Sequence, residues 1–529
     1  MSFHVYDTTL RDGAQQEGMN LSVADKLAIA PYLDELGVGF IEGGWPGAVP
    51  KDTDFFARAA RELTLKNAVL AAFGATRKVG TRAEDDPQVF ALLHSGAPVV
   101  TLVAKSDIRH VERALRTTAE ENLAMITDTV RFLVSEGRRV VVDAEHFFDG
   151  YRFDPAYSRS AVEAALAAGA EVVALCDTNG GMLPHWVSDI VTEIRDAVGD
   201  GPVLGMHAHN DTGCAVANTL AAVDAGCSHV QGTVNGYGER TGNADLVTVV
   251  ANLELKGGRS LLAGEGLGDA SRIAHAISEI TNISPYARQP YVGASAFAHK
   301  AGLHASAIKV DPDLYQHIDP TLVGNDMRML VSDMAGRASI ELKGKELGFD
   351  LSGQAEVLTR ITSRVKEAEA NGYTYDAADA SFELLLVEEM VGERPRYFDV
   401  ESWRTIVERT GHRGVVATAE ATVKLNAGGE RHVSTGEGNG PVNALDQALR
   451  LALTRVYPQI ETFELIDFKV RILDQEHGTD AITRVLIETT DGQRSWSTVG
   501  VGPNLLEASW EALTDSAIYG LVHAGVEPR

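Results

Sequence analysis

Residues 139–146 read RVVVDAEH, and this stretch contains the pattern that decides the fold. A short β-branched run, residues 139–142, ends in polar side chains, and a helical stretch rich in Ala, Leu and Glu follows. The pattern recurs over the first 260 residues, at a spacing of about 25–40 residues that fits one strand plus one helix. The other runs are His4–Tyr6, Val38–Ile41, Ala68–Ala72, Pro98–Val103, Glu171–Leu175, Pro202–Gly205 and Ser228–Gly232.

Eight such units predict an α/β fold, namely a (β/α)8 TIM barrel of parallel strands covered by helices. A doubly wound open sheet is the alternative fold. It fits less well, because the eight units are regular and no Gly-x-Gly-x-x-Gly pattern follows the first run.

Charged or hydrogen-bonding residues follow nearly every predicted strand. A closed barrel brings these carboxyl ends to one face, where barrel enzymes have their active sites. We therefore expect an active site built from these segments. They are residues 7–12 (DTTLRD), 42–44, 74–76, 105–106, 143–146, 176–179, 207–211 and 235–236.

His207 and His209 form a candidate metal site, because residues two apart on a strand point to the same side. Asp12, which follows the first run, becomes their neighbour once the barrel closes. Two imidazoles, a carboxylate and open positions suit a divalent cation (Zn, Mn or Mg) that also binds substrate. Asn243 can add an oxygen ligand, and Arg11 can stabilise an oxyanion beside the metal. The alternatives are polar rim residues without a metal and an Arg11 that only forms a salt bridge.

The composition limits the classes of partner. The 529 residues include 74 acidic and 47 basic side chains, for a net charge of −27. This acidity argues against nucleic acid or an anionic membrane as partner. The three cysteines fit a reducing compartment, and no apolar run reaches the ~20 residues of a membrane span. The first residues lack a signal-peptide pattern, so we expect a cytoplasmic protein.

Three motifs carry a resemblance to a known family. They are DTTLRDG at 7–13 with Gln15 after it, HAHND at 207–211 and GYGERTGN at 236–243. Together they resemble the metal-dependent aldolase-type barrels that include the 2-isopropylmalate, homocitrate and citramalate synthases. Within that family, DAEHFFDGY at 143–151, SAFAHKAGLH at 295–304, and VSD at 331–333 with Gly336 and Arg337 are most similar to the citramalate synthase group.

Two departures argue against other members of the superfamily. The biotin-dependent carboxyltransferases have a metal-binding lysine where this chain has Cys176. The hydroxymethylglutaryl-CoA lyases have a cysteine in a glycine-rich loop, and the matching stretch here, Asn235–Asn243, has none.

The resemblance implies an acyltransferase that condenses acetyl-CoA with pyruvate and hydrolyses the thioester to give (R)-citramalate and CoA, on a route to isoleucine. It agrees with Asp12, His207 and His209 as metal ligands and implies that Asn243 lies in or near the metal shell. It also implies that four residues bind the 2-oxo acid, namely Arg11, Gln15, Glu42 and Thr178.

The acetyl group must lose a proton to a nearby base. The resemblance implies that Glu145 contacts substrate and that His304 and Tyr315 take part in acyl-CoA binding and acid–base work. The identity of the base stays open between a buried carboxylate with a raised pKa and a neutral His304. Without the resemblance, a structural role for His304 is the simpler interpretation.

The acceptor must be distinguished from its larger homologues. Excluding one methylene from an apolar pocket contributes about 1–3 kcal/mol, so the pocket must be small and filled. Phe73 and Leu102 are candidate fillers, and core packing is the alternative role of each.

The second half of the chain predicts two further regions after a barrel at 1–265. Residues 266–395 are mostly helical in pattern, and we expect a lid or linker that completes the active site across a homodimer. Residues 396–529 contain an internal repeat with two ββα copies, which predicts an α+β regulatory domain. Its predicted strand pairs are Ala421–Leu425 with His432–Thr435 and Thr483–Glu488 with Arg494–Val499, followed by helices over Ala444–Leu449 and Ala508–Leu513.

The glycine-rich turns before these two helices can hold a small carboxylate at a helix N-terminus. The resemblance implies feedback inhibition by an amino acid, with isoleucine first and leucine second. A purely structural or dimerising module is the alternative. For the whole chain, the alternatives are a 2-isopropylmalate or homocitrate synthase, a retro-aldol lyase, and an amino-acid-binding regulatory protein with an inactive barrel.

Overall fold

The computed structural model describes residues 3–264, 266–408, 418–473 and 481–528. The chain forms two compact units, Met1–Phe297 with Ile318–Asp326 and Ala298–His317 with Met327–Arg529. The three regions expected from the sequence stay a prediction, and residues 1, 265 and 529 at their ends lie outside the described residues.

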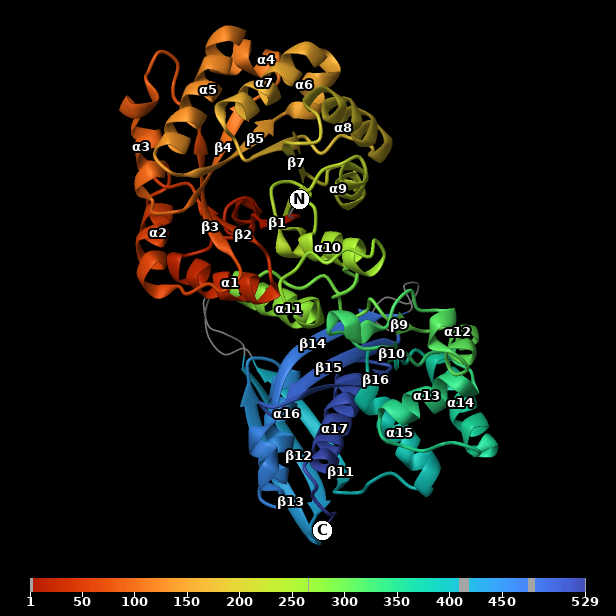
Figure 1. Ribbon diagram of the computed structural model, residues 1–529. Coiled ribbons are helices and arrows are strands. Elements are labelled where there is room, and N and C mark those ends of the chain that lie inside the picture. The colour runs from red at the N-terminus through yellow and green to blue at the C-terminus, as the bar shows by residue number, and fades with distance from the viewer. Residues whose placement is uncertain (1–2, 265, 409–417, 474–480, 529) are drawn as a thin grey trace. The chain divides into compact units, whose positions relative to one another are not determined.

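The first unit contains the predicted barrel (Figure 1). Eight parallel strands close in sequence order, with β8 beside β1. The strands are β1 His4–Asp7, β2 Phe40–Gly44, β3 Val69–Ala75, β4 Val99–Lys105, β5 Arg139–Glu145, β6 Val172–Asp177, β7 Val203–Ala208 and β8 His229–Gly232. Strands β1 to β7 extend further into the polar segments than expected, because backbone pairing continues there. Lys105 pairs with Glu145, and Cys176 pairs with His207.

A helix follows each strand. These helices are α1 Val23–Leu36, α2 Pro50–Glu62, α3 Pro87–His94, α5 Ala119–Ser135, α7 Pro155–Ala168, α8 Pro184–Val198, α9 Ala215–Asp224 and α10 Leu246–Leu255. Short helices α4 Ile108–His110 and α6 Phe147–Phe153 precede α5 and α7, and α11 Ala270–Thr281 follows α10. Local sequence sets the ends: a capping box of Ser22 and Asp25 starts α1, and Gly37 at φ 92° ends it.

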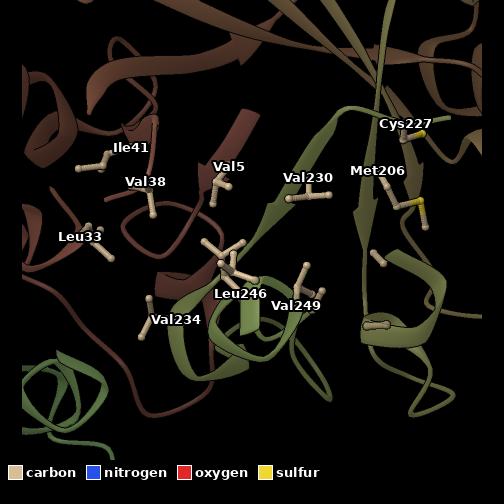
Figure 2. Close-up of a cluster of buried hydrophobic side chains, with 14 of the residues drawn as sticks. Val5, Leu33, Val38, Ile41, Met206, Cys227, Val230, Val234, Leu246 and Val249 are labelled. Carbon is tan, nitrogen blue, oxygen red and sulfur yellow. The ribbon is translucent and has the colours of Figure 1, made fainter. Parts of the chain in front are cut away.

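The core of this unit has two layers. Tyr6, Phe40 and Val141 belong to a cluster contributed by the strands β1 to β6. A larger cluster lies between the strands and the surrounding helices. Figure 2 shows part of it, where Val5 of β1 and Val230 of β8 lie near Leu246 of α10. The packed layers hold the strand ends in place, and the site is built on those ends.

The second unit begins with a two-stranded sheet and four helices. These are β9 Ala298–His299, β10 Arg328–Met329, α12 Gly302–Ile308, α13 Arg337–Glu346, α14 Ala355–Ala370 and α15 Asp379–Val391. The predicted repeat follows, but each copy is βββα rather than ββα. The first copy is β11 Asp399–Glu408, β12 Thr418–Ala427, β13 Glu430–Gly438 and α16 Pro441–Leu453; the second is β14 Glu464–Ile472, β15 Thr483–Thr490, β16 Ser495–Gly502 and α17 Leu505–His523.

The strands missed from the sequence, β11 and β14, lie at sheet edges and are largely exposed. They therefore lack the strict buried alternation that identifies a strand. None of the described helices combines the length and apolar character needed to cross a membrane.

Candidate active site and metal-binding group

Asp12 lies in a turn beyond β1 rather than on the strand itself. The strand ends at Asp7, and the amides of Asp12 and Gly13 then donate to the Thr8 carbonyl oxygen at 2.9 and 3.1 Å. The carboxylate of Asp7 accepts from the Thr9 amide and hydroxyl at 2.9 and 2.8 Å, which stabilises the start of the turn. The turn brings Asp12 to His207 and His209.

Asp12, His207 and His209 form a compact buried group at the end of β7. Asp12 Oδ2 lies 3.2 Å from His207 Nε2 and 3.9 Å from His209 Nε2, and the two Nε2 atoms are 3.3 Å apart. One ligand atom from each residue lies within 4.8 Å of the others. Among the described residues, this is the group of His, Cys, Asp and Glu side chains whose geometry can hold a metal ion.

The surroundings of this group, including Asn243 and Gly238, are also suited to a bound cation. Asn243 donates from Nδ2 to Asp12 Oδ2 at 2.9 Å, and its buried amide oxygen has no hydrogen-bond partner among the described residues. Gly238, at φ +153°, leaves the space for this amide, since a Cβ there would lie 2.3 Å from Asn243 Oδ1. Burial and the nearby charge of His207 lower the pKa of His209 to about 4, so its imidazole is neutral and able to coordinate.

Gln231 of β8 orients His207 and was not identified from the sequence. Its Oε1 lies 2.8 Å from His207 Nδ1, and its Nε2 donates to Asp143 Oδ1 of β5 at 2.8 Å. A hydrogen bond at Nδ1 leaves Nε2 of the ring facing Asp12 and free for a metal. Gln231 is the strand partner of His207, and Gln231 and Asp143 are both buried.

Arg11 stands beside this group and is held on two sides. Its Nε donates to Glu42 Oε2 at 2.7 Å, and its guanidinium lies over the Phe73 ring, 3.8 Å from the centroid. Burial would raise the pKa of Asp12, but Arg11 and His207 outweigh it and hold this pKa well below its usual range. Asp12 is therefore ionised and suited to a cation.

A cavity of about 700 Å³ opens over these residues. The predicted residues that line it are Arg11, Asp12, Gln15, Phe73, Glu145, Thr178, His207 and His209. Glu42 is not among its lining residues; it is fully buried and contacts Arg11 instead. The prediction that Leu102 fills the acceptor pocket is wrong, because Leu102 packs in the layer between strands and helices. Side chains alternate along β4, so its neighbour Val103 lines the cavity instead.

Glu145 and Thr178 lie near each other at the ends of β5 and β6. Lys105 Nζ forms an ion pair with Glu145, and Thr178 Oγ1 accepts from the amide of His146 at 2.8 Å. Lys105 lies in the polar strand end 105–106 that was expected to contribute to the active site, but its pairing with Glu145 was not predicted. The carboxylate of Glu145 is therefore ion-paired at the cavity wall.

His304 and Tyr315 belong to the second compact unit. Their rings stack with centroids 4.1 Å apart, so the two residues expected to act together do contact each other. Their role at the cavity stays a prediction.

A second cavity, of about 640 Å³, lies in the C-terminal repeat. The start of α16 lines one side of it, and Phe463, Leu465 and Phe468 supply apolar surface. Asp446, Arg450, Glu461 and Glu464 add charged groups to the lining.

Comparison with known families covers most of the chain. Residues 2–277 match the HMGL-like family, residues 291–372 match the homocitrate synthase post-HMGL domain-like family, and residues 376–520 match the LeuA allosteric (dimerisation) domain. The first match spans the barrel and its metal group, and the last spans the repeat.

Full-length relatives narrow the family further. An (R)-citramalate synthase of Streptomyces coelicolor is 65% identical over 100% of this chain and 98% of its own length. An (R)-citramalate synthase of Aquifex aeolicus is 47% identical over 98% of each chain. A 2-isopropylmalate synthase of Methanocaldococcus jannaschii is more distant, 30% identical over 97% of this chain and 93% of its own. The chain therefore belongs to the HMGL-like family and, within it, to the (R)-citramalate synthases.

Proposed function

We propose that this chain condenses acetyl-CoA with pyruvate and water to give (R)-citramalate and CoA. The observation that carries the proposal is the buried group of Asp12, His207 and His209 beside Arg11, in the cavity of a chain 65% identical to an (R)-citramalate synthase. The product places the enzyme on a route to isoleucine that starts from pyruvate.

Asp12, His207 and His209 would hold a divalent cation, Zn, Mn or Mg, with Asn243 at the edge of the site. Such a cation, when bound, supplies Lewis-acid polarisation of the ketone of a 2-oxo acid. The donor set fits, because it combines an ionised carboxylate, a neutral His209 and an amide oxygen without a hydrogen-bond partner among the described residues.

Arg11 binds the acceptor and stabilises the negative charge that develops on its ketone oxygen. Glu42 holds the guanidinium at 2.7 Å and Phe73 stacks on it, so its position is fixed before substrate binds. Gln15 and Thr178 line the same cavity and bind the acceptor with Arg11. Glu42 acts through its ion pair with Arg11.

The proton of the acetyl methyl group leaves to a base supplied by Glu145 or by His304 with Tyr315. Glu145 lines the cavity and forms an ion pair with Lys105. His304 and Tyr315 stack on each other and complete the site in a homodimer built through the C-terminal domain. A Glu145→Gln variant distinguishes the two candidate bases. Enolate formation is lost if Glu145 is the base and is retained if His304 with Tyr315 supplies it.

The C-terminal cavity is the site of a feedback inhibitor, with isoleucine first and leucine second. The start of α16 at Gly440 has no side-chain cap, so its amides are available to a carboxylate. The apolar lining from Phe463 and Phe468 suits a branched side chain, and Asp446 and Glu461 suit an ammonium group.

CoA release from acetyl-CoA tests the function, with pyruvate, 2-oxobutyrate, 2-oxoisovalerate and 2-oxoglutarate supplied one at a time. We expect a clear preference for pyruvate and (R)-citramalate as the product. A preference for 2-oxoisovalerate would assign the enzyme to 2-isopropylmalate synthesis, and one for 2-oxoglutarate to homocitrate synthesis. No release with any acceptor would contradict synthase activity and favour a regulatory protein with an inactive barrel.

A further inference from the structure

Two aromatic side chains form a wall of the barrel cavity beside Arg11. Trp45 follows β2, Phe73 lies in β3, and both line the cavity. Their rings pack at 83° with centroids 5.2 Å apart, and the guanidinium of Arg11 lies over the Phe73 ring. Trp45 therefore contacts Phe73 edge to face, Phe73 contacts Arg11, and Arg11 in turn lies 3.5 Å from the carboxylate of Asp12.

The buried ion pair between Lys26 and Asp52 holds the backbone of Trp45. Asp52, in the first turn of α2, accepts from the Trp45 amide at 2.8 Å and from Lys26 Nζ at 2.5 Å. Lys26 is 2% exposed and also donates to the Gly43 carbonyl oxygen at 2.9 Å. Buried charges are tolerated only when they are paired and hydrogen-bonded, so this pair strongly favours a single arrangement of the loop.

Gly44 allows the close approach on which this arrangement depends. Its φ is +145°, and a Cβ there would lie 2.4 Å from Asp52 Cγ. The backbone from Gly43 to Trp45 is thus held against α2 and α1, which places the indole with its ring against Phe73.

A rigid wall in this place bears on the choice of acceptor. A 2-oxo acid turns its carboxylate and ketone oxygens toward the metal group and Arg11, which leaves its alkyl substituent to meet apolar surface. The ring that contacts Arg11 is Phe73, and Trp45 packs against that ring. An aromatic wall held in this place disfavours a larger alkyl group, by about 10–200-fold in kcat/KM for one added methylene.

We infer that Trp45 is a specificity-determining residue that limits the alkyl group of the 2-oxo acid, and that Lys26 and Asp52 are positioning residues for it. The inference rests on the proposed function. Trp45 thereby joins Phe73, which was expected from the sequence to fill the acceptor pocket. The inference also assigns a role to the buried Lys26–Asp52 ion pair, which lies outside the metal group.

The test measures kcat/KM for 2-oxobutyrate and for pyruvate in Trp45→Ala, Trp45→Leu and Trp45→Phe. We expect the 2-oxobutyrate to pyruvate ratio to rise at least about tenfold in the Ala and Leu variants, the effect of roughly one methylene. Trp45→Phe keeps an aromatic wall and should stay closer to the unsubstituted protein. Asp52→Asn, which loosens the loop, should shift the ratio in the same direction by less.

Trp186→Ala is the matched control, because Trp186 of α8 packs against Arg152 and is not among the residues that line the cavity. Its ratio should not change. A folded Trp45→Leu variant whose ratio stays within twofold of the unsubstituted protein would overturn the inference, as would an equal rise in Trp186→Ala. An unsubstituted protein that releases no CoA with pyruvate would instead contradict the proposed function.

Discussion

The barrel cavity and the C-terminal cavity are similar in size and differ in how their polar groups are satisfied. In the barrel, Asp12, His207 and Gln231 are buried and joined by hydrogen bonds or ion contacts into one network. In the C-terminal cavity, the start of α16 carries no side-chain cap. Removing one member of a buried network leaves other groups unpaired, whereas changing an open helix start alters one contact.

The internal repeat sharpens this contrast. The second copy begins α17 with Asn504, whose Oδ1 accepts from the amides of Leu506 and Glu507, both at 3.0 Å. The first copy has Gly440 at the same place, with a similar extended backbone and no cap. The same fold unit therefore provides one helix start with a side-chain cap and one without. Gly440, at the uncapped start of α16, lines the cavity, whereas the capping residue Asn504 does not, although its neighbour Leu505 does.

The largest expected effect is the loss of the metal group. In His207→Ala, we expect bound divalent metal to be lost and CoA release to fall to background, because one of the three chelating side chains is gone. Metal content by elemental analysis and the rate of CoA release check this. Isoleucine binding by calorimetry is the control, and it should be retained if the two cavities bind independently. If the His207→Ala variant kept its bound metal and its rate of CoA release, His207 would not be a metal ligand and the contrast between the two cavities would not hold.

Replacing Arg11 tests the charge beside that group. Arg11→Gln should lower kcat by about 10²–10³, the loss typical of one preorganised oxyanion donor. Metal content should be retained, since Arg11 is not a ligand. Steady-state kinetics at saturating metal separates the two effects. An unchanged kcat with only a raised KM would limit Arg11 to ground-state binding.

Gln231→Leu tests the hydrogen bond that orients His207. Loss of this partner should weaken metal affinity by about 10–100-fold. Titration of the chelator-treated protein with Mn²⁺ measures it. We expect activity to recover at high metal concentration, which distinguishes a positioning role from a general loss of folding.

The smallest expected effect concerns the C-terminal cavity. Gly440→Asn supplies the missing cap, and no heavy atom lies within 4 Å of a Cβ at Gly440, so the side chain is accommodated. The isoleucine concentration for half-inhibition should rise by about 2–5-fold, which corresponds to about 0.4–1 kcal/mol and is within the range typical of one charge at a helix end. Asn504→Gly in the other copy should cost a few tenths of a kcal/mol in stability and leave inhibition unchanged. If both variants changed the isoleucine concentration for half-inhibition equally, the proposed difference between the helix starts of the two copies would be contradicted.

Much of the barrel site follows from the sequence because parallel strands collect their carboxyl ends on one face. His207 lies in β7 and His209 follows directly after its last residue, and closure of β8 on β1 brings Asp12 to them. Gln231 was missed because a single polar residue in a short run does not reveal its partner. Its contact with His207 depends on the register between β7 and β8.

Other features depend on tertiary contacts that no local pattern encodes. Glu42 has the polar strand-end position expected of a substrate contact, yet it is buried against Arg11. Leu102 and Val103 differ only in the side of β4 from which they project, and a shift of one residue exchanges cavity and core. The exposed edge strands β11 and β14 gave too little alternation to be identified.

The most direct test of the account is the rate of CoA release by chelator-treated protein with acetyl-CoA and pyruvate, before and after Mn²⁺ is restored. We predict a rate near background without metal, full recovery with it, and no release when pyruvate is omitted. Release that is independent of added metal or of pyruvate would contradict a metal-dependent condensation at Asp12, His207 and His209.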